Sequence, residues 1–482
     1  MSHTESQTPE QRTPNRPGLP ARLREGWRRH GSRRWVKTGM PLAVIGLAVW
    51  ALAHEMSSSR LQSVAIGALA GQLNYEVKPG EADRSELRFP GAGPYDLRMG
   101  YTQLPEFVGL LKGQGFAVTG QARMSAKLVS YSDSGLFPAY REKAQGGLEV
   151  RDCRGDRLFS ARYPQRIYGD FDNVPRLLVD ALLFIENREL LDEEHPTRNP
   201  ALEWDRLGKA MLERAATVVT SGQRSPGGST LATQIEKYRH SPEGRTDSMR
   251  EKWHQMASAS LRAYVDGRDT LAWRQQLVVD YLNTVPLSAR SGYGEVNGMG
   301  DGLWAWYGRD IGEINRLLKQ PVADDRPLTI DPKRFRAKAF KQAVIDQQAL
   351  AFKQALSLMV AQRRPSHYLQ DGHDDLVELT DRYIRVMATA GLIPPALRDA
   401  ALEAKLERAS QNGVDAVANF VDRKASTTVR SKLGSMLKVS RSYDIDRLDL
   451  VAATNLDGEV QAAATRLLRS LNDPEFAKAS GL

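Results

Sequence analysis

The chain has 482 residues and a mass of 53.6 kDa, which is enough to bury a sizeable core in two or three domains. Its net charge is +9, but residues 1–39 hold nine Lys or Arg against three acids, so the remaining body is nearly balanced. A nucleic-acid binder keeps its basic excess on a folded domain, so this distribution argues against nucleic acid as a partner. The only cysteine, Cys153, excludes an internal disulfide.

The N-terminal end resembles a membrane anchor. Residues 1–34 are polar and rich in Pro and Arg, as disordered tails are. The apolar run that follows is unbroken from Met40 to Ala53, and it predicts one transmembrane helix over 35–55. The arginine-rich flank predicts a cytoplasmic N-terminus, with the bulk of the chain outside the membrane. A cleaved signal peptide is the alternative, although the flank His54-Glu55-Met56 lacks the small residues of a cleavage site.

The rest of the chain divides by its pattern of apolar residues. Residues 60–170 alternate β-like pieces with Gly/Pro turns and include one helical piece, which predicts a small α+β module. From Pro175 onward the pattern is mainly helical. The glycines between Ser288 and Gly308 predict a structured loop, with Trp304 and Trp306 either in the core or touching the membrane.

A glycine turn followed by a polar helix start predicts an anion site at SPGGSTLATQIEKYR, residues 225–239. Glycines allow a tight turn, and Ser229 or Thr230 can cap the helix that follows, so its free N–H groups face an anion. Gln234 and Lys237 lie three residues apart and share a face of that helix. An ordinary capped helix after a glycine loop is the alternative.

Glu186 is the strongest candidate for a catalytic acid or base. In a helix, Glu186 shares one face with an apolar set, namely Val179, Leu182, Leu183 and Leu190. A carboxylate in apolar surroundings is suited to proton transfer near neutral pH. The alternative is that Glu186 marks the solvated end of the helix, paired with Arg188 or Lys209.

Four ordered segments carry a resemblance to a known family: NVPRLLVDALLFIENREL, GGSTLATQIEKY, VVDYLNTVPL and GDGLWAWYGRD. Together they resemble the family 51 glycosyltransferases, the peptidoglycan-polymerising module of class A penicillin-binding proteins. The resemblance implies a mainly α, lysozyme-like glycosyltransferase domain that follows one transmembrane helix and a small α+β module. The predicted divisions are a tail at 1–34, a transmembrane helix at 35–55, an α+β module at 60–170, the glycosyltransferase domain at 171–320, its helical extension at 321–405, and a polar linker with a transpeptidase-type lead-in at 406–482.

The resemblance implies roles for particular residues. Glu186 would be the base, and the donor phosphates would be held by Ser229, Thr230, Gln234, Lys237 and Arg250. Asn283, in the Tyr-Leu-Asn motif, would be structural. The family's third motif, Arg-Lys-x-x-Glu, reads Met249-Arg250-Glu251-Lys252-Trp253-His254-Gln255 here, so its glutamate is missing and Glu251 is the candidate second acid.

The resemblance also implies a reaction and partners. The chain would polymerise a lipid-linked disaccharide-pentapeptide, lipid II, into glycan chains at the bacterial inner membrane, with other cell-wall synthesis proteins meeting residues 60–170. No cofactor is required and no dedicated metal ligands are predicted, although a divalent cation, Mg²⁺ or Mn²⁺, often assists at the pyrophosphate in this family. Ser435 and Lys438 match a penicillin-reactive Ser-x-x-Lys, but no Lys-Thr-Gly occurs, so we expect no transpeptidase domain.

Two other functions stay open at this stage. A degenerate site would bind the donor without catalysis, as a scaffold of a cell-wall complex. A lysozyme-like domain with Glu186 as general acid would cut glycan instead of joining it.

Overall fold

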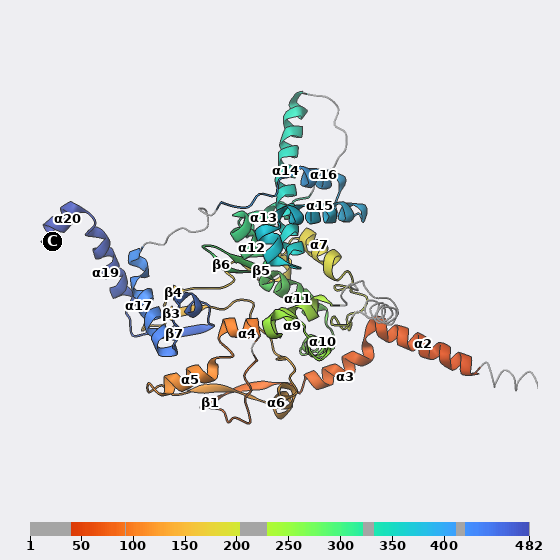
Figure 1. Ribbon diagram of the computed structural model, residues 1–482, viewed down its shortest axis with the longest axis horizontal. Helices are drawn as coiled ribbons and strands as arrows, with labels where there is room; N and C mark the ends of the chain where they lie inside the picture. Colours follow the sequence, from red (N-terminus) through yellow and green to blue (C-terminus); the bar gives the residue numbers. More distant parts are fainter. Residues whose placement is uncertain (1–39, 92, 203–228, 322–331, 411–419, 482) are drawn as a thin grey trace, which may run out of the picture. The chain divides into compact units, whose positions relative to one another are not determined.

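The computed structural model describes residues 40–91, 93–202, 229–321, 332–410 and 420–481 (Figure 1). Contacts divide the chain into two compact units, Met1–Ser57 and Ser58–Leu482. The predicted tail at 1–34 and the glycine pair Gly227-Gly228 lie outside the described residues.

The predicted transmembrane segment corresponds to helix α2, Met40–Ser58, whose apolar side chains are exposed. No single helix within the described ranges is both long enough and apolar enough to cross a membrane. The apolar stretch of α2 is short because it ends at the polar residues His54 and Glu55. Helix α3, Arg60–Ala70, follows at a bend, and only the bent pair passes this test together. Within the described residues, the single membrane-spanning helix expected over 35–55 is therefore not found.

The region from 60 to 170 contains both helices and strands. Strand β1, Tyr75–Pro79, pairs antiparallel with β2, Gly120–Met124, and β3, Leu148–Arg151, pairs antiparallel with β4, Arg157–Ser160. Three short helices lie between these strands: α4, Pro94–Met99, α5, Leu104–Lys112, and α6, Ala126–Asp133. The alternating pattern of the sequence thus produces two small sheets with helices between them.

One of these sheets is completed by the C-terminal end of the chain. Strand β7, Leu450–Ala453, pairs in parallel with β3, so β3 lies between β4 and β7 (Figure 1). Buried apolar residues from both ends of the chain pack around this sheet, namely Phe107, Leu148, Val150, Leu437, Ile445 and Leu448. The predicted α+β module at 60–170 is therefore built together with residues of the segment at 406–482.

The main core lies among helices after residue 171. It is formed by α7, Arg176–Glu186, α9, Leu231–His240, α10, Met249–Ala263, α11, Leu271–Thr284, α12, Gly298–Tyr307, α13, Ile311–Lys319, α14, Pro332–Ala361, α15, His373–Thr389, and α16, Pro395–Glu403. Ala349, Phe352 and Leu356 of α14 are fully buried. A single cluster of buried residues runs from Tyr168 to Leu406, so the helices after residue 332 extend the same core.

The prediction of a loop between Ser288 and Gly308 is wrong. This segment forms a hairpin, β5, Pro286–Arg290, with β6, Gly294–Asn297, and then helix α12. The glycines of α12 serve close packing: a Cβ atom at Gly300 would lie 2.3 Å from the Arg166 carbonyl oxygen, and one at Gly302 would lie 2.5 Å from Leu287. Burial of this face outweighs the low helix propensity of glycine.

The tryptophans of α12 belong to this packing. Trp306 is 4% exposed, and its indole N–H donates a hydrogen bond to the Leu287 carbonyl oxygen at 3.1 Å. Trp304 is half-buried under the guanidinium of Arg166, 4.2 Å from the ring centre. Of the two predicted roles, the structure therefore supports core packing.

The remaining helices are short or peripheral. They are the 3₁₀ turns at Phe171–Asn173 and Pro242–Gly244, a π-helical turn at His367–Asp371, α17, Phe420–Leu437, α18, Ser442–Ile445, α19, Gly458–Ser470, and α20, Pro474–Ala479.

Candidate active site

Glu186 is the last residue of α7 and lies in a buried position, 7% exposed. The preceding turns of α7 bury Leu178, Val179 and Leu182, so the helix is fixed against the core by its apolar stripe. The side-chain amide of Gln234 donates to Glu186 Oε2 at 2.5 Å, and that of Gln362 donates to Oε1 at 2.8 Å. Both carboxylate oxygens are therefore held in a fixed orientation.

The helix that carries Gln234 begins where the sequence predicted it. Thr230 is the N-cap of α9, and its hydroxyl oxygen accepts a hydrogen bond from the Thr233 N–H at 3.3 Å. Thr230 is completely buried, so this hydroxyl serves the cap. Of the two predicted capping residues, Thr230 takes this role, which leaves Ser229 with a different one.

Ser229 contacts a lysine, Lys252, that the sequence motifs do not predict. The ammonium of Lys252, on α10, donates to Ser229 Oγ at 2.7 Å. Burial, together with the positive charge of Lys237, lowers the pKa of Lys252 to about 8. The pKa of Lys237 is also lowered by burial, while the negative charge of Glu186 opposes that change. Two half-buried ammonium groups thus lie close to each other and to the start of α9.

This group of residues, Ser229, Lys237 and Lys252, is termed the lysine cluster. Neither lysine forms an ion pair with an acid within the described ranges. Two neighbouring cations beside the single negative charge of Glu186 favour an anionic ligand, and a lysine acts on a phosphate as a point charge. The lysine cluster is therefore chemically suited to phosphate groups, next to a fixed carboxylate.

Arg250 and Glu251 are placed differently from the prediction. Arg250 is exposed and lines a separate cavity of about 540 Å³ with Glu251 and His254. Ser248 caps α10 by accepting from the Glu251 N–H at 3.1 Å, and the Glu251 carboxylate accepts from the Asp247 N–H at 3.0 Å. Glu251 is thus part of a capping arrangement at the start of α10. The structure does not bring Arg250 or Glu251 to the lysine cluster.

Asn283 has the structural position that the sequence predicted. Its side-chain oxygen accepts from the Tyr168 N–H at 2.8 Å, and its amide donates to the Tyr168 carbonyl oxygen at 2.8 Å. The buried amide of Asn283 therefore satisfies both backbone groups of Tyr168, in the segment that leads into α7.

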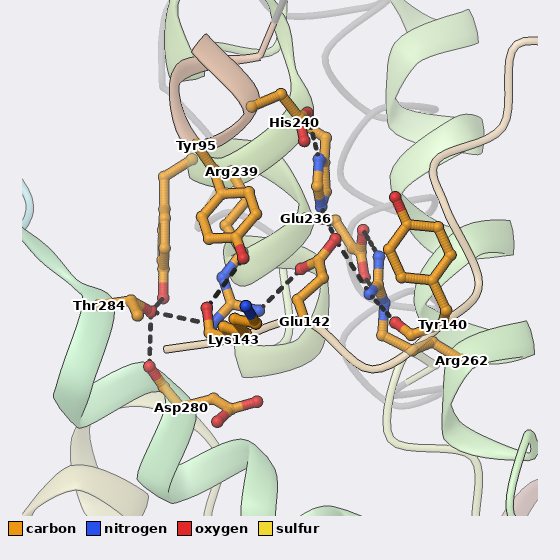
Figure 2. A network of polar contacts seen from close by, with 12 residues as sticks. Tyr95, Tyr140, Glu142, Lys143, Glu236, Arg239, His240, Arg262, Asp280 and Thr284 are labelled. Carbon is orange, nitrogen blue, oxygen red and sulfur yellow. Dashed lines mark hydrogen bonds and ion pairs between the residues drawn. The ribbon is translucent and has the colours of Figure 1, made fainter. Parts of the chain in front are cut away.

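The back of α9 is fixed by a buried ion network (Figure 2). Glu142, from the segment between α6 and β3, has a side chain that is 3% exposed. Its carboxylate lies 2.9 Å from Arg239 Nη1, 2.6 Å from His240 Nε2 and 3.2 Å from Arg262 Nη1. Burial opposes its ionisation, but the charges of Arg262 and His240 hold the pKa of Glu142 well below its usual range. One acid from outside the helical core thus connects α9 and α10.

His240 is the cation of this network that can titrate. Its Nδ1 lies 2.9 Å from Asp96 of α4, and its Nε2 contacts Glu142. Burial alone would lower the pKa of His240, but the negative charge of Glu142 and the hydrogen bonds to both acids outweigh that effect and raise the pKa to about 9. His240 is therefore protonated at neutral pH and completes the charge balance behind α9.

No group of three or more Asp, Glu, His or Cys side chains is arranged to hold a metal ion among the described residues. The divalent cation that the resemblance implies stays a prediction.

Sequence motifs predicted part of this site. The motifs predict Glu186, Gln234 and Lys237, and the structure places them together. The motifs do not predict Lys252 and Gln362. Lys252 lies in the stretch that departs from the third motif, and the two half-buried lysines are brought together only by the packing of α9 against α10. Gln362 lies just beyond α14, and nothing in the local sequence distinguishes it from a surface glutamine.

Comparisons with known proteins agree with this geometry. A family model described as transglycosylase matches residues 155–390. The chain is 25% identical over 295 residues to penicillin-binding protein 1B of Vibrio cholerae serotype O1, which covers 57% of this chain and 34% of that relative. The chain thus spans about a third of the length of this curated relative. The matched range contains Glu186 and the lysine cluster.

Proposed function

Residues 155–390 belong to the transglycosylase family, the family 51 glycosyltransferases, and on that premise we propose that this protein polymerises lipid-linked disaccharide-pentapeptide, lipid II, into glycan chains. The observation that carries the proposal is the 2.5 Å contact between Glu186 and Gln234. It joins the acid of the first motif to the helix of the second, so that a carboxylate and a phosphate-suited group of lysines share one site.

In the proposed reaction, Glu186 accepts the proton of a sugar hydroxyl on the acceptor. The hydroxyl oxygen attacks the anomeric carbon of the donor, and the bond from that carbon to the pyrophosphate oxygen breaks. The electron pair leaves with the lipid diphosphate, and the proton stays on Glu186. Atoms and charge balance without a further reactant.

The lysine cluster would stabilise the leaving group. Negative charge develops on the bridging oxygen as the bond breaks, and preorganised cations lower the energy of that state. Lys237 and Lys252 are held in place before the reaction by packing and by Ser229, so they need little reorganisation. Gln234 and Gln362 keep the Glu186 carboxylate directed at the acceptor.

The replacement Glu186→Gln tests this assignment. A well-placed general base contributes about 100- to 10,000-fold in rate, so we expect polymerisation to fall by at least about 100-fold. The measurement is glycan-chain formation from labelled lipid-linked disaccharide by the full chain in detergent. Glu189→Gln is the matched control, because Glu189 is three residues away and its side chain is 57% exposed. Equal turnover by both variants, with both folded by circular dichroism, would refute the role of Glu186.

One observation favours a second candidate function. Glu251, the candidate second acid, is used in the cap of α10 and is not brought to the lysine cluster. A protein with an incomplete acid pair would bind the donor without transferring it and would act as a scaffold in a cell-wall complex. Wild-type protein that binds labelled donor and forms no glycan chain would support this scaffold over the polymerase.

The glycan-cleaving alternative fits the site less well. A hydrolase of uncharged glycan has no departing diphosphate, so it has no use for two half-buried lysines beside its acid. Clearing zones on a gel that contains purified peptidoglycan would favour cleavage.

The proposed substrate places the protein at a membrane. A lipid-linked donor stays in the bilayer, so an enzyme that uses it works at the bilayer surface. We infer that α2 and its flank anchor the chain to the bacterial inner membrane with the bulk of the chain outside the cytoplasm. Residues 60–170 are the proposed contact for other cell-wall synthesis proteins.

A further inference from the structure

A second cavity, distinct from the candidate active site, lies between three distant segments of the chain. It has a volume of about 760 Å³ and is lined by α4, by Tyr238 and Arg239 of α9, by the β5–β6 hairpin, and by residues 438–448. None of Glu186, Gln234 or the lysine cluster lines it. Its size is that of a small-molecule site.

Three cations that form no ion pair within the described residues line this cavity. They are Arg98 of α4, Lys438 at the end of α17, and Arg447 after α18. Within the part of the chain that the structure describes, no carboxylate oxygen lies within 4.0 Å of a side-chain nitrogen of any of the three, so none of them forms an ion pair. Neighbouring buried arginines differ, since Arg239 and Arg262 are both paired with Glu142. Three acids, Glu243, Glu295 and Asp444, also line the cavity. Asp444 is paired with Arg441 and Glu243 with Arg245, so Glu295 is left against the three cations, and the described lining keeps a surplus of positive charge.

Arg447 is held rigidly at the cavity wall. It is 5% exposed, and its guanidinium lies 3.6 Å from the ring centre of Tyr443 and 4.1 Å from that of Tyr163. Tyr443 is itself fixed, because its hydroxyl accepts from the Glu295 N–H at 3.0 Å. A guanidinium clamped between two rings keeps its N–H edge free for a planar or tetrahedral anion.

Arg98 is close enough to the other cations to be affected by them. Burial lowers the pKa of Arg98, the negative charge of Glu295 opposes that change, and the charges of Arg239 and Arg447 add smaller lowering effects. Glu295 offsets part of the free-energy cost of bringing these cations together, and a bound anion would offset more of it.

Lys438 occupies a backbone position that favours glycine. Its φ angle is 56°, in the left-handed region, and the Val439 N–H closes the end of α17 on the Gly434 carbonyl oxygen at 2.8 Å. Glycine is the usual residue at such a helix end, and other residues there cost roughly 1 kcal/mol or more. Lys438 is exposed and lines the cavity, so a lysine here offers a positive charge to the cavity at the expense of stability, which is expected where the side chain has a function.

We propose that this cavity is a binding site for a phosphate-bearing anion, held by Arg98, Lys438 and Arg447 and separate from the proposed catalytic site. The arginines supply paired N–H donors, and Lys438 supplies a point charge. The same chemistry occurs in a free diphosphate and in the headgroup of an anionic phospholipid.

Calorimetry with inorganic pyrophosphate tests the proposal on the full chain in detergent. The background variant carries Lys237→Gln and Lys252→Gln, so that the lysine cluster no longer contributes a phosphate site. We expect this background to bind pyrophosphate, and the added change Lys438→Gly to weaken binding by about tenfold. Lys432→Gln is the control, because Lys432 is an exposed lysine of α17 outside the cavity.

Lys438→Gly also separates a binding role from a folding role. Glycine suits the left-handed backbone, so the melting temperature should stay the same or rise while binding falls. Arg98→Gln should weaken binding as well. A second arm presents phosphatidylglycerol in phosphatidylcholine nanodiscs. If Lys438→Gly weakens binding only to the nanodiscs, the ligand is a lipid headgroup. If Lys438→Gly weakens binding of soluble pyrophosphate, the ligand is a free anion. Binding that neither Lys438→Gly nor Arg98→Gln weakens, in either arm, overturns the proposal.

Discussion

Lys252 has an ammonium group that titrates within the working range of most enzymes. Burial and the charge of Lys237 bring the pKa of Lys252 to about 8, and its hydrogen bond to Ser229 directs it at the start of α9. In the proposed reaction this cation acts on the leaving diphosphate. Its charge should therefore decide how fast the free enzyme captures and transfers the donor as the pH changes.

We expect Lys252→Met to lower kcat/KM by about 100-fold, the effect of removing one preorganised donor from a developing anion. In the wild type, kcat/KM should decrease above about pH 8 as Lys252 loses its proton, and Lys252→Arg should move that decrease to higher pH. The measurement is the pH profile of glycan-chain formation. Arg250→Met is the comparison, since Arg250 lines the separate cavity of about 540 Å³. A larger loss in Arg250→Met than in Lys252→Met would return the phosphate role to the residue that the motif favoured.

Helix α9 connects the chemistry on one side with an ion network on the other. Gln234 and Lys237 face the Glu186 site, while Arg239 and His240 are paired with Glu142 at the back (Figure 2). Two acids of this network, Asp96 and Glu142, lie outside the matched range 155–390. The position of the α9 side chains in the site thus depends on residues that a family model does not include.

His240 gives this network a predictable response to pH. Its pKa is about 9 in the folded chain, against an ordinary value of 6.5, so its protonation stabilises the fold fully below pH 6.5. That contribution is lost as the pH rises through 9, and the free energy of unfolding should decrease by about 3 kcal/mol between these limits. Denaturant unfolding at pH 6, 7.5 and 9 measures the decrease.

The replacement His240→Asn should flatten that dependence. The matched control is His367→Asn, because His367 pairs with Asp375 at the surface and has no part in the network. If His240→Asn retains the full decrease at alkaline pH, another group is responsible for it.

The elements show which parts of the fold a sequence can predict. The helices from Pro175 onward follow an apolar period that the sequence displays, and the first of them, α7, was predicted together with the position of Glu186. The prediction for the segment from Ser288 to Gly308 is wrong, because glycine has a low helix propensity in isolation. In the packed helix α12, glycine is needed for close approach to Arg166 and Leu287. Contacts such as Gln362 to Glu186, 176 residues apart, are set by tertiary packing alone.

At the scale of the whole molecule, the sheet β4-β3-β7 joins the two ends of the folded unit. The backbone N–H groups of Leu450 and Thr454 donate hydrogen bonds to the carbonyl oxygens of Gly147 and Arg151. In a parallel ladder every second residue of a strand donates to the same neighbour, so the Ala452 N–H is directed to β3 as well. The Val451 N–H then points away from β3. Residues 451 and 452 thus lie on the same strand, but only the N–H of Ala452 donates to β3.

We therefore expect Ala452→Pro to lower the free energy of unfolding by about 1–3 kcal/mol, because proline removes a ladder hydrogen bond and exposes its acceptor. Val451→Pro should have a much smaller effect, since an edge strand tolerates proline where its N–H faces away from the sheet. Thermal unfolding of both variants provides the measurement. Equal melting temperatures would mean that β7 contributes nothing to the fold of residues 60–170.

The pairing of β3 with β7 also has a consequence for biosynthesis. The two strands are separated by about 300 residues, and ribosomes add about 5–20 residues per second, so β3 waits for roughly 15–60 s before its neighbour is made. During that interval one side of β3 presents unsatisfied backbone groups to any other nascent chain. Translation of this protein thus creates a window in which a chaperone that covers extended segments would prevent aggregation.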